Sequence, residues 1–182
     1  MQRYIAFLRG VNVGGNGLIK MTELKECLGA DGLHEVQTYI QSGNIIFSST
    51  SSNKKELSEQ ITQAIKRTFH LDVAVAVFTA AEWHAVIAKA PKWWGKNSEW
   101  KHNILILTET VAPAKVVEAI GILKPAIEAI EPGKGVVYQS VSFTDFGKAT
   151  SGKLASNPIY KKMTVRNFNT ANKLVGLVSA AP

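Results

Sequence analysis

The chain has 182 residues, of which 46% are hydrophobic and 19% are charged, and its formal net charge is +7. This composition is typical of a folded globular protein and argues against an intrinsically disordered chain. The length fits one domain or two small ones. The excess of positive charge favours a phosphorylated or polyanionic partner, either a small molecule or a nucleic acid.

Cysteine and histidine usage argues against a disulfide and against a zinc centre. The single cysteine, Cys27, cannot form an internal disulfide, and the four histidines lack zinc-ligand spacing. We therefore expect no metal and no cofactor. The apolar run from Tyr4 to Leu8 stops at Arg9, far short of the ~20 residues of a membrane span. A cytoplasmic protein without a membrane partner is expected.

The N-terminal half alternates between strand and helix patterns. Continuous apolar runs predict buried strands, whereas apolar residues at three- and four-residue spacing predict helices. Asn53 and Glu56 form a capping-box pattern that predicts a helix start. The predicted elements are a strand at 4–8, a helix from 21 to about 29, a β-hairpin at 36–47, a helix at 53–69 and a strand at 73–78.

This β-α-β-β-α-β order is typical of a ferredoxin-like split βαβ unit. In that topology the first and second strands run parallel, and the third strand lies between them. Three connections should then reach one edge of the sheet. They are the loop at 9–20, the hairpin turn at 41–44 and the turn that carries His70 and Asp72.

The C-terminal half shows a weaker repeat of the same order. Thr79 and Glu82 form a capping box that opens a helix, which ends at Pro91 and connects the two halves. The later elements are a strand at 104–107, a helix after residue 113, strands at 126–130 and 136–143, a short helix from 158 and a last helix after Thr170. We predict an α+β fold with two ferredoxin-like subdomains, residues 1–79 and 80–182, related by duplication and built on antiparallel sheets.

The loop from Arg9 to Lys20 is the best candidate for a site. It contains four glycines and two asparagines, which tolerate left-handed backbone and expose N–H groups. The two flanking cations and the N-terminus of the following helix favour an anion. It is not a P-loop, because Asn16 stands where the lysine belongs, and it lacks the G-x-G-x-x-G pattern. The alternative is a tight turn that merely needs glycine.

A tryptophan-rich segment follows the connecting helix. Trp93, Trp94 and Trp100 are interleaved with lysines, an arrangement that can stack bases of a single strand. The alternative is that these indoles pack the second subdomain onto the first.

Two further functional classes stay open. His70 and Asp72 together could move a proton on a small phosphorylated substrate, which would make the protein an enzyme. The sequence names no catalytic residue beyond this pair. An interaction module that self-associates through sheet edges or the tryptophan segment is the other class. The oligomeric state does not follow from the sequence.

Three strings resemble a known family. They are AFLRGVNVGG at residues 6–15, TYIQSGNIIF at 38–47 and TVRNFNT at 164–170. Together they are similar to the pattern of a bacterial family catalogued as domain-of-unknown-function family 1697, over nearly the whole chain. The resemblance implies a cytosolic protein with a duplicated ferredoxin-like arrangement, and it brings no established activity.

The polar residues and glycines of these strings are the candidate ligand-binding residues. Each also has a structural interpretation, such as Thr170 as a helix cap or Arg166 as a tie between subdomains. If they form one site, Arg166 and its neighbours should face the loop at 9–20 across a common groove. The candidates are Arg9, Asn12, Gly14, Gly15, Asn16, Lys20, Gln41, Ser42, Asn44, Arg166, Asn167 and Lys173.

Overall fold

The computed structural model describes residues 1–15 and 17–179, and each of its two compact units contains one four-stranded sheet. Unit 1 comprises Met1–His84 together with the C-terminal segment from Leu174. Unit 2 comprises Ala85–Lys173. All strand pairs in both sheets are antiparallel. The predicted α+β class with antiparallel sheets is therefore confirmed.

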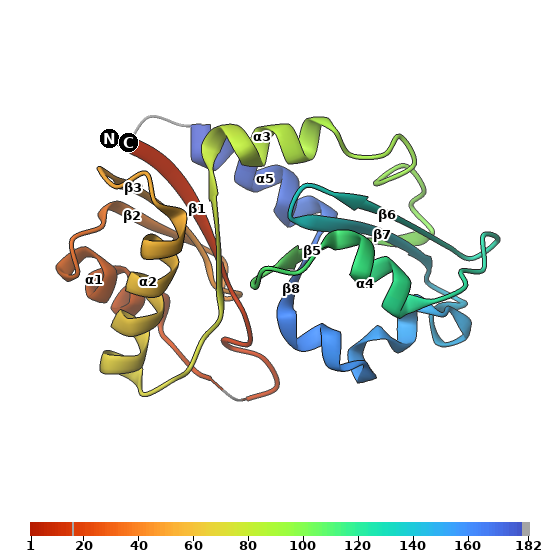
Figure 1. The fold of residues 1–182 in the computed structure, drawn as a ribbon, viewed down its shortest axis with the longest axis horizontal. Coiled ribbons are helices and arrows are strands. Elements are labelled where there is room, and N and C mark those ends of the chain that lie inside the picture. Colours follow the sequence, from red (N-terminus) through yellow and green to blue (C-terminus); the bar gives the residue numbers. More distant parts are fainter. Residues whose placement is uncertain (16, 180–182) are drawn as a thin grey trace. The chain divides into compact units, whose positions relative to one another are not determined.

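In unit 1 the strand order is β2-β3-β1-β4, with β1 in the interior of the sheet. Helices α1 and α2 cover one face of this sheet (Figure 1). The elements are β1 (Gln2–Leu8), α1 (Met21–Ala30), β2 (His34–Tyr39), β3 (Asn44–Ser49), α2 (Lys54–Phe69) and β4 (Val75–Thr79).

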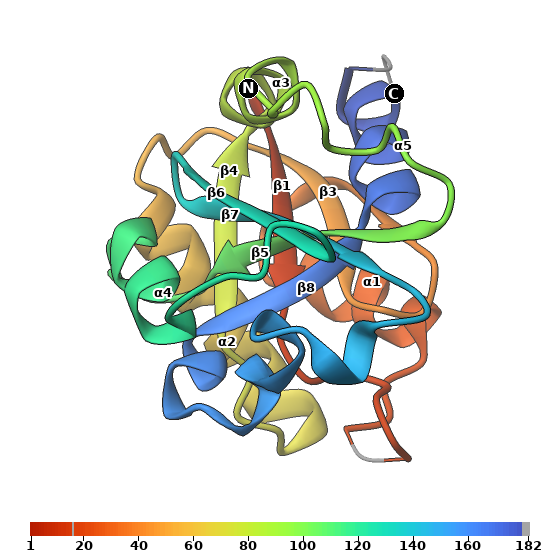
Figure 2. The same ribbon diagram turned by 90° about the vertical axis from the view of Figure 1, so that its right-hand side faces the viewer.

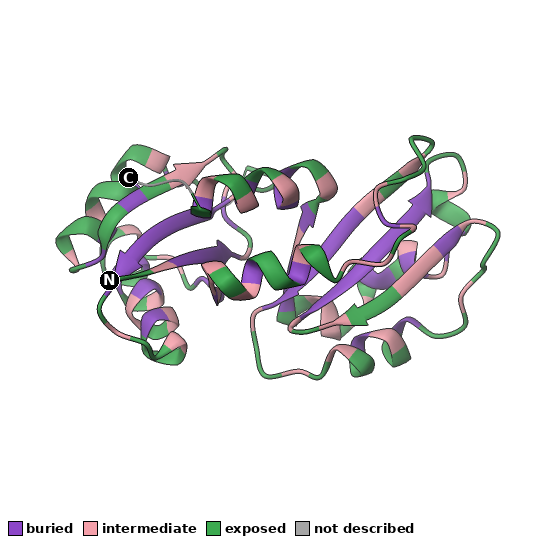
Figure 3. Ribbon diagram, turned by 90° about the horizontal axis from the view of Figure 1, so that it is seen from above, coloured by how far each residue is buried: buried purple, intermediate pink, exposed green. Residues whose placement is uncertain are grey.

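Both faces of β1 are buried, as its continuous apolar sequence predicts. Tyr4, Ala6 and Leu8 join the core cluster that also contains the buried side chains of α1 and α2. Phe7 points to the opposite face, where its ring packs against Phe78 and Trp83 with centroids 6.1 and 4.7 Å apart. Figure 3 shows β1 and β3 in the colour of buried residues, whereas the helices expose one side.

The two capping boxes that the sequence predicts, at Asn53 and at Thr79, both form. Asn53 Oδ1 accepts hydrogen bonds from the N–H groups of Lys55 and Glu56, at 3.1 and 3.4 Å. Thr79 and Glu82 form a reciprocal capping box with two bonds of 3.0 Å, at the start of α3 (Ala80–Ala88). Side chains thus satisfy backbone donors that a helix N-terminus otherwise leaves without partners.

In unit 2 the strand order is β6-β7-β5-β8, so the first strand again lies between the third and the fourth. Helix α4 covers part of one face (Figure 1). Three 3-10 turns, η1 to η3, link β7 to β8. The elements are β5 (Trp100–Leu107), α4 (Pro113–Ile120), β6 (Glu128–Gly133), β7 (Val136–Ser142), η1 (Phe146–Lys148), η2 (Ser151–Ser156), η3 (Pro158–Lys162) and β8 (Met163–Asn167). The last helix, α5 (Phe168–Ser179), begins in unit 2, and its residues from Leu174 belong to unit 1.

The structure contains one strand that the sequence analysis did not predict. β8 (Met163–Asn167) pairs with β5 as an edge strand, although Thr164, Arg166 and Asn167 give it a polar sequence. Two of these polar side chains, Thr164 and Arg166, are buried, so hydrophobic alternation could not reveal the strand. Along the chain, unit 1 ends at His84 and unit 2 begins at Ala85. The predicted domain boundary, between residues 79 and 80, stays a prediction.

Candidate functional site

Asn12 closes the loop between β1 and α1 on itself and ties it to the β2–β3 turn. Its Oδ1 accepts the N–H of Ile19 at 2.8 Å. Its Nδ2 donates to the carbonyl oxygens of Ile19 at 3.0 Å and of Gln41 at 2.9 Å. We call these three hydrogen bonds the Asn12 clamp. Asn12 has φ +54°, a left-handed conformation that asparagine tolerates better than most residues.

The β2–β3 turn is held by a second asparagine. Asn44 is fully buried, and its Nδ2 donates to the carbonyl of Tyr39 and to Ser42 Oγ, both at 3.0 Å. Gly43, between them, has φ +70°, and a Cβ placed there would lie 2.5 Å from Val11 Cγ2. The structural roles of Asn12, Asn44 and Gly43 therefore explain why asparagine and glycine stand at these positions.

The three predicted connections meet at one edge of the sheet of unit 1. The Asn12 clamp joins the loop to the turn, and Arg9 N–H donates to the carbonyl of Ala74 at 2.9 Å, just before β4. This part of the prediction is confirmed. His70 forms the left-handed C-cap of α2. Asp72 forms an ion pair with Lys66 at 2.7 Å. Its carboxylate, which the enzyme hypothesis requires as the partner of His70, therefore interacts with a lysine instead.

The tip of the loop is open and partly apolar. Gly14 and Gly15 have φ +61° and +80°, and a Cβ built at either position would meet no atom within 4 Å. Val13 and Leu18 are 63% and 73% exposed. Figure 2 shows the chain leaving β1 and running through this loop before α1. The exposure of these two apolar side chains was not predicted from the sequence. The predicted site residue Asn16 lies outside the described residues.

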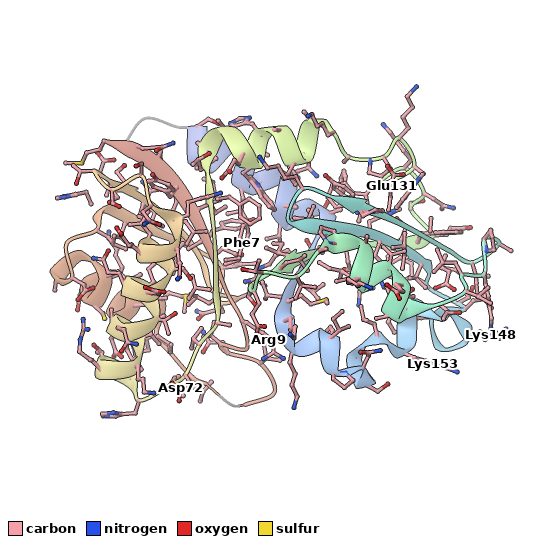
Figure 4. The ribbon with its side chains drawn as sticks, in the orientation of Figure 1. Phe7, Arg9, Asp72, Glu131, Lys148 and Lys153 are labelled. Atoms are coloured by element: carbon pink, nitrogen blue, oxygen red, sulfur yellow. The ribbon has the colours of Figure 1, made fainter. Side chains whose placement is uncertain are left out.

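Two cations flank the loop within unit 1. Arg9 is half-buried directly after β1 (Figure 4). Lys20 is the N-cap residue of α1 and makes no side-chain cap, because an ammonium group donates hydrogen bonds and cannot accept one from a backbone N–H. It pairs with Glu23 at 3.0 Å, and both side chains are exposed. Such an exposed pair contributes little to stability, and its ammonium group stays accessible to an anion.

The C-terminal motif is built into unit 2. Arg166 is 6% exposed, and its Nη1 donates to Thr164 Oγ1 at 2.7 Å and to the carbonyl of Val165 at 2.8 Å. Burial lowers the pKa of Arg166 to about 10. Asn167 Oδ1 accepts the N–H of Thr170 at 2.8 Å, which is an N-cap contact for α5. The interpretation of Thr170 as the cap was therefore wrong.

Lys173, the last predicted residue of this motif, is exposed on α5. The contacts of Arg166 and Asn167 explain these two residues locally, as a polar strand contact and a helix cap. The predicted groove shared by this motif and the loop at 9–20 stays a prediction.

The tryptophan segment packs inside unit 2. Trp94 is 4% exposed, and its indole N–H donates to the carbonyl of Asn103 at 2.8 Å. Its ring lies edge to face with Tyr138 and Phe168. These contacts of Trp94 all lie within unit 2, so the alternative in which the tryptophans pack one subdomain onto the other stays a prediction. Trp93 and Trp100 are half-buried.

Other surface features escaped the sequence analysis. A hollow of about 340 Å³ lies beside α1 and β2 and contains none of the predicted site residues. Phe143 and Phe146, after β7, are 59% and 39% exposed. Phe143 was predicted as part of the preceding strand, and an aromatic residue in a strand is usually packed, so its exposure could not be expected from the pattern.

The described residues contain neither a candidate metal cluster nor a helix that could cross a membrane. Within residues 1–15 and 17–179, no group of three or more histidine, cysteine, aspartate or glutamate side chains could hold a metal ion. Among the helices of the same residues, none has both the length and the apolar character to cross a membrane.

Comparison with known proteins gives a family and a structural relative. The family described as "Protein of unknown function (DUF1697)" matches residues 1–138, a range that excludes the motif at 164–170. The structure is similar to that of the conserved bacterial protein SP0830 from Streptococcus pneumoniae, with 27% identity, a TM-score of 0.87 and coverage of 98% of this chain and 99% of that chain. No curated protein matches. Because the family match spans well over half of the 182 residues, the chain belongs to the DUF1697 family of proteins of unknown function.

Proposed function

We propose that the protein binds a small phosphorylated ligand, a nucleotide in the first instance, at the loop of residues 9–20 without transforming it. The observation that carries this proposal is the combination of an open tip and a fixed stem. Gly14 and Gly15 leave backbone accessible, while the Asn12 clamp holds the base of the loop. A loop that is already ordered loses less entropy on binding.

Electrostatics around the loop supports an anionic ligand. The first turn of α1 lacks a side-chain cap, so its N–H groups and the positive end of the helix dipole are accessible to a phosphate. Arg9 and Lys20 add positive charge at the two ends of the loop. The neighbouring turn contributes the polar side chains of Gln41 and Ser42.

The apolar side chains of the tip favour a nucleotide over a bare phosphate. Val13 and Leu18 are largely exposed, and exposed apolar surface close to polar groups is typical of a ligand or partner contact. A nucleobase or another flat apolar group would cover them while its phosphates face the glycines.

Calorimetric titration with ATP, AMP and inorganic phosphate tests this proposal. Two matched pairs of variants make the test specific. Lys20→Ala removes a charge at the loop, and Lys25→Ala removes the same charge elsewhere on α1. Gly14→Asp adds a negative charge to the tip, and Gly14→Asn adds a side chain of nearly the same size without the charge. Both fit a left-handed position better than other residues.

We expect ATP to bind, and we expect Lys20→Ala and Gly14→Asp to weaken binding at least tenfold relative to their controls. A thermal-shift assay gives a second readout, because a ligand at 100 times its Kd stabilises the folded state by ~2.7 kcal/mol. Absence of binding by all three probes would overturn the proposal. Equal effects of both members of each pair would place the site elsewhere.

The wider form of the site includes the C-terminal residues Arg166, Asn167 and Lys173. Lys173 provides the cleanest test because it is exposed and lies on the surface of α5. Lys173→Ala should weaken ATP binding if these residues belong to the same site. An unchanged affinity in this variant would restrict the site to the loop and the β2–β3 turn.

We also infer that each unit is ferredoxin-like and that the two arose by duplication. The support is the strand order, which is second-third-first-fourth in both sheets, with a helix between the first and second strands of each. A cytoplasmic location completes the proposal, in keeping with the free Cys27.

A second candidate function is self-association of two copies through the loop and the β2–β3 turn. Ile40 is 49% exposed and has φ +50°, an outlier for a β-branched residue. It precedes Gln41, which the Asn12 clamp ties to the loop that carries Val13 and Leu18. Light scattering of the native protein and of Val13→Ser/Leu18→Ser tests this candidate. A dimer that dissociates in the variant supports it, and a native monomer excludes it.

A further inference from the structure

The net positive charge of the protein belongs entirely to unit 2. Unit 1 contains eight lysine and arginine residues and eight aspartate and glutamate residues, so its net charge is zero. Unit 2 contains 13 lysine and arginine residues and six aspartate and glutamate residues, so its net charge is +7. The excess of positive charge that favours a polyanion is therefore carried by unit 2.

The lysines of unit 2 are available to a partner. All 12 are exposed. Only Lys115, Lys148 and Lys162 have a carboxylate within 4.0 Å in the described part of the chain. The remaining lysines would lose little by exchanging water for a phosphate, because they give up no ion pair.

Two exposed aromatic rings lie among some of these lysines, on the turn after β7. Phe143 is 59% exposed and Phe146 is 39% exposed. Lys101 Nζ lies 5.3 Å from the centroid of the Phe146 ring. Lys124 Nζ donates to the carbonyl oxygen of Lys148, two residues beyond Phe146, at 2.6 Å. Lys148 and Lys153 both lie on the segment that follows β7 (Figure 4).

Hydrogen bonds hold this turn in place. The Asp145 carboxylate accepts bonds from Ser142 Oγ at 3.2 Å and Thr144 Oγ1 at 3.1 Å. It also accepts one from Lys148 Nζ at 2.8 Å. Phe143 N–H donates to the carbonyl of Glu99 at 3.1 Å. The two rings are thus presented to solvent by a fixed turn, and their exposure does not result from a loose chain.

We propose that unit 2 binds single-stranded nucleic acid, with Phe143 and Phe146 stacking on bases and Lys101 and Lys124 contacting phosphates. Exposed rings next to cations match the way proteins bind single strands without sequence preference. A duplex keeps its bases stacked inside and offers no such face to the rings. This site shares no residue with the nucleotide site proposed at the loop, because its residues belong to the other unit.

Fluorescence anisotropy with a labelled oligothymidylate of about 15 nucleotides tests this proposal. We expect Phe143→Ala/Phe146→Ala to weaken binding about tenfold or more, whereas Phe143→Tyr/Phe146→Tyr keeps the rings and should retain affinity. Lys101→Ala/Lys124→Ala should reduce the slope of log K against log salt by roughly 1.4, two single-strand phosphate contacts at about 0.7 each. Lys25→Ala in unit 1 is the charge-matched control and should leave the slope unchanged.

Several outcomes would overturn the proposal. One is absence of oligonucleotide binding at about 50 mM salt, where this electrostatic contribution is strong. Another is equal binding of the alanine and tyrosine double variants, which would show that the rings do not stack. A third is that a duplex of the same length binds tighter than the single strand. If Gly14→Asp weakens oligonucleotide binding as much as the alanine double variant, the strand binds at the loop instead. Equal unfolding midpoints of all variants must accompany these comparisons.

Discussion

The side chain of Asn12 donates a hydrogen bond to the carbonyl oxygen of Gln41, 29 positions further along the chain, at 2.9 Å. This contact fixes the separation of the loop at 9–20 and the β2–β3 turn. Any ligand that contacts both segments would therefore meet a preformed surface. The same contact means that Asn12 contributes to stability whether or not a ligand binds.

Replacing Asn12 should separate its hydrogen-bonding role from its backbone role. Asn12→Gly keeps the left-handed backbone at no steric cost and removes the clamp, so we expect a loss of about 1–3 kcal/mol. Asn12→Ala removes the same bonds and adds a left-handed penalty of about 1–2 kcal/mol. Urea unfolding measures both. Equal stability of the two variants would show that φ of residue 12 relaxes when its side chain is lost.

Gly43→Ala should be more harmful than Gly14→Ala. Both glycines have positive φ, but a Cβ at Gly43 would lie 2.5 Å from Val11 Cγ2 and 2.7 Å from Leu8 Cβ, while a Cβ at Gly14 meets open space. The extra cost at Gly43 should be about 1–3 kcal/mol, the usual range for overpacking. Thermal unfolding of the two variants gives the difference, and similar midpoints would contradict the close packing of Gly43 on β1.

Glu128→Gln should destabilise unit 2 by about 1–3 kcal/mol at neutral pH. Glu128 is 1% exposed, and its carboxylate accepts the N–H groups of Lys124, Thr150 and Ser151 at 2.8–2.9 Å. The glutamine side chain would replace one accepting oxygen by an NH2 group, which cannot accept a hydrogen bond from these backbone N–H groups. Urea unfolding measures the loss, and Glu131→Gln is the control because Glu131 is exposed on the same strand.

The effect of Glu128→Gln should also depend on pH. Burial would raise the pKa of Glu128, but the hydrogen bonds from Ser151, Lys124 and Thr150 outweigh it and lower the pKa below 4.5. A carboxylate with a lowered folded-state pKa contributes stability above its unfolded pKa and loses it as the pH falls through the folded value. The stability difference between native protein and variant should therefore shrink below about pH 4.5. A constant difference would contradict the hydrogen-bonded carboxylate.

Tyr138→Phe should change the alkaline stability of the protein. Burial, followed by the charge of Glu131, raises the pKa of Tyr138 to about 12, and its hydroxyl donates to the carbonyl of Val86 at 2.6 Å. The neutral phenol makes its full contribution to the free energy of unfolding below about pH 10, and this contribution is lost as the pH rises toward 12. The native protein should lose more stability than the variant between these values. Parallel curves in denaturant titrations would contradict this.

The sequence by itself determined the local structure of most elements. Apolar runs and helical spacing predicted β1, α1 and α2, and the caps at Asn53 and Thr79 formed as expected. These features depend on residues close together in the chain, so a pattern within a short window is sufficient to identify them. The motifs at 6–15 and 38–47 likewise predicted the family that the match confirmed.

The tertiary structure gives several candidate residues contacts that their sequence could not predict. Asn12 donates to the carbonyl of Gln41, Asn44 to that of Tyr39 and Arg166 to Thr164 Oγ1. Each of these candidate side chains therefore has a partner in the fold, and their part in a ligand site stays a prediction. β8 became a strand because β5 supplies its partner, although its own sequence is polar.

The location of the net charge was also a tertiary result. Composition gives the total of +7, but only the division into compact units shows that unit 1 is neutral and that the excess belongs with Phe143 and Phe146. Such properties depend on which distant residues the fold brings together. Hydrophobic periodicity carries no information about those pairings, because it reports only which face of an element is buried.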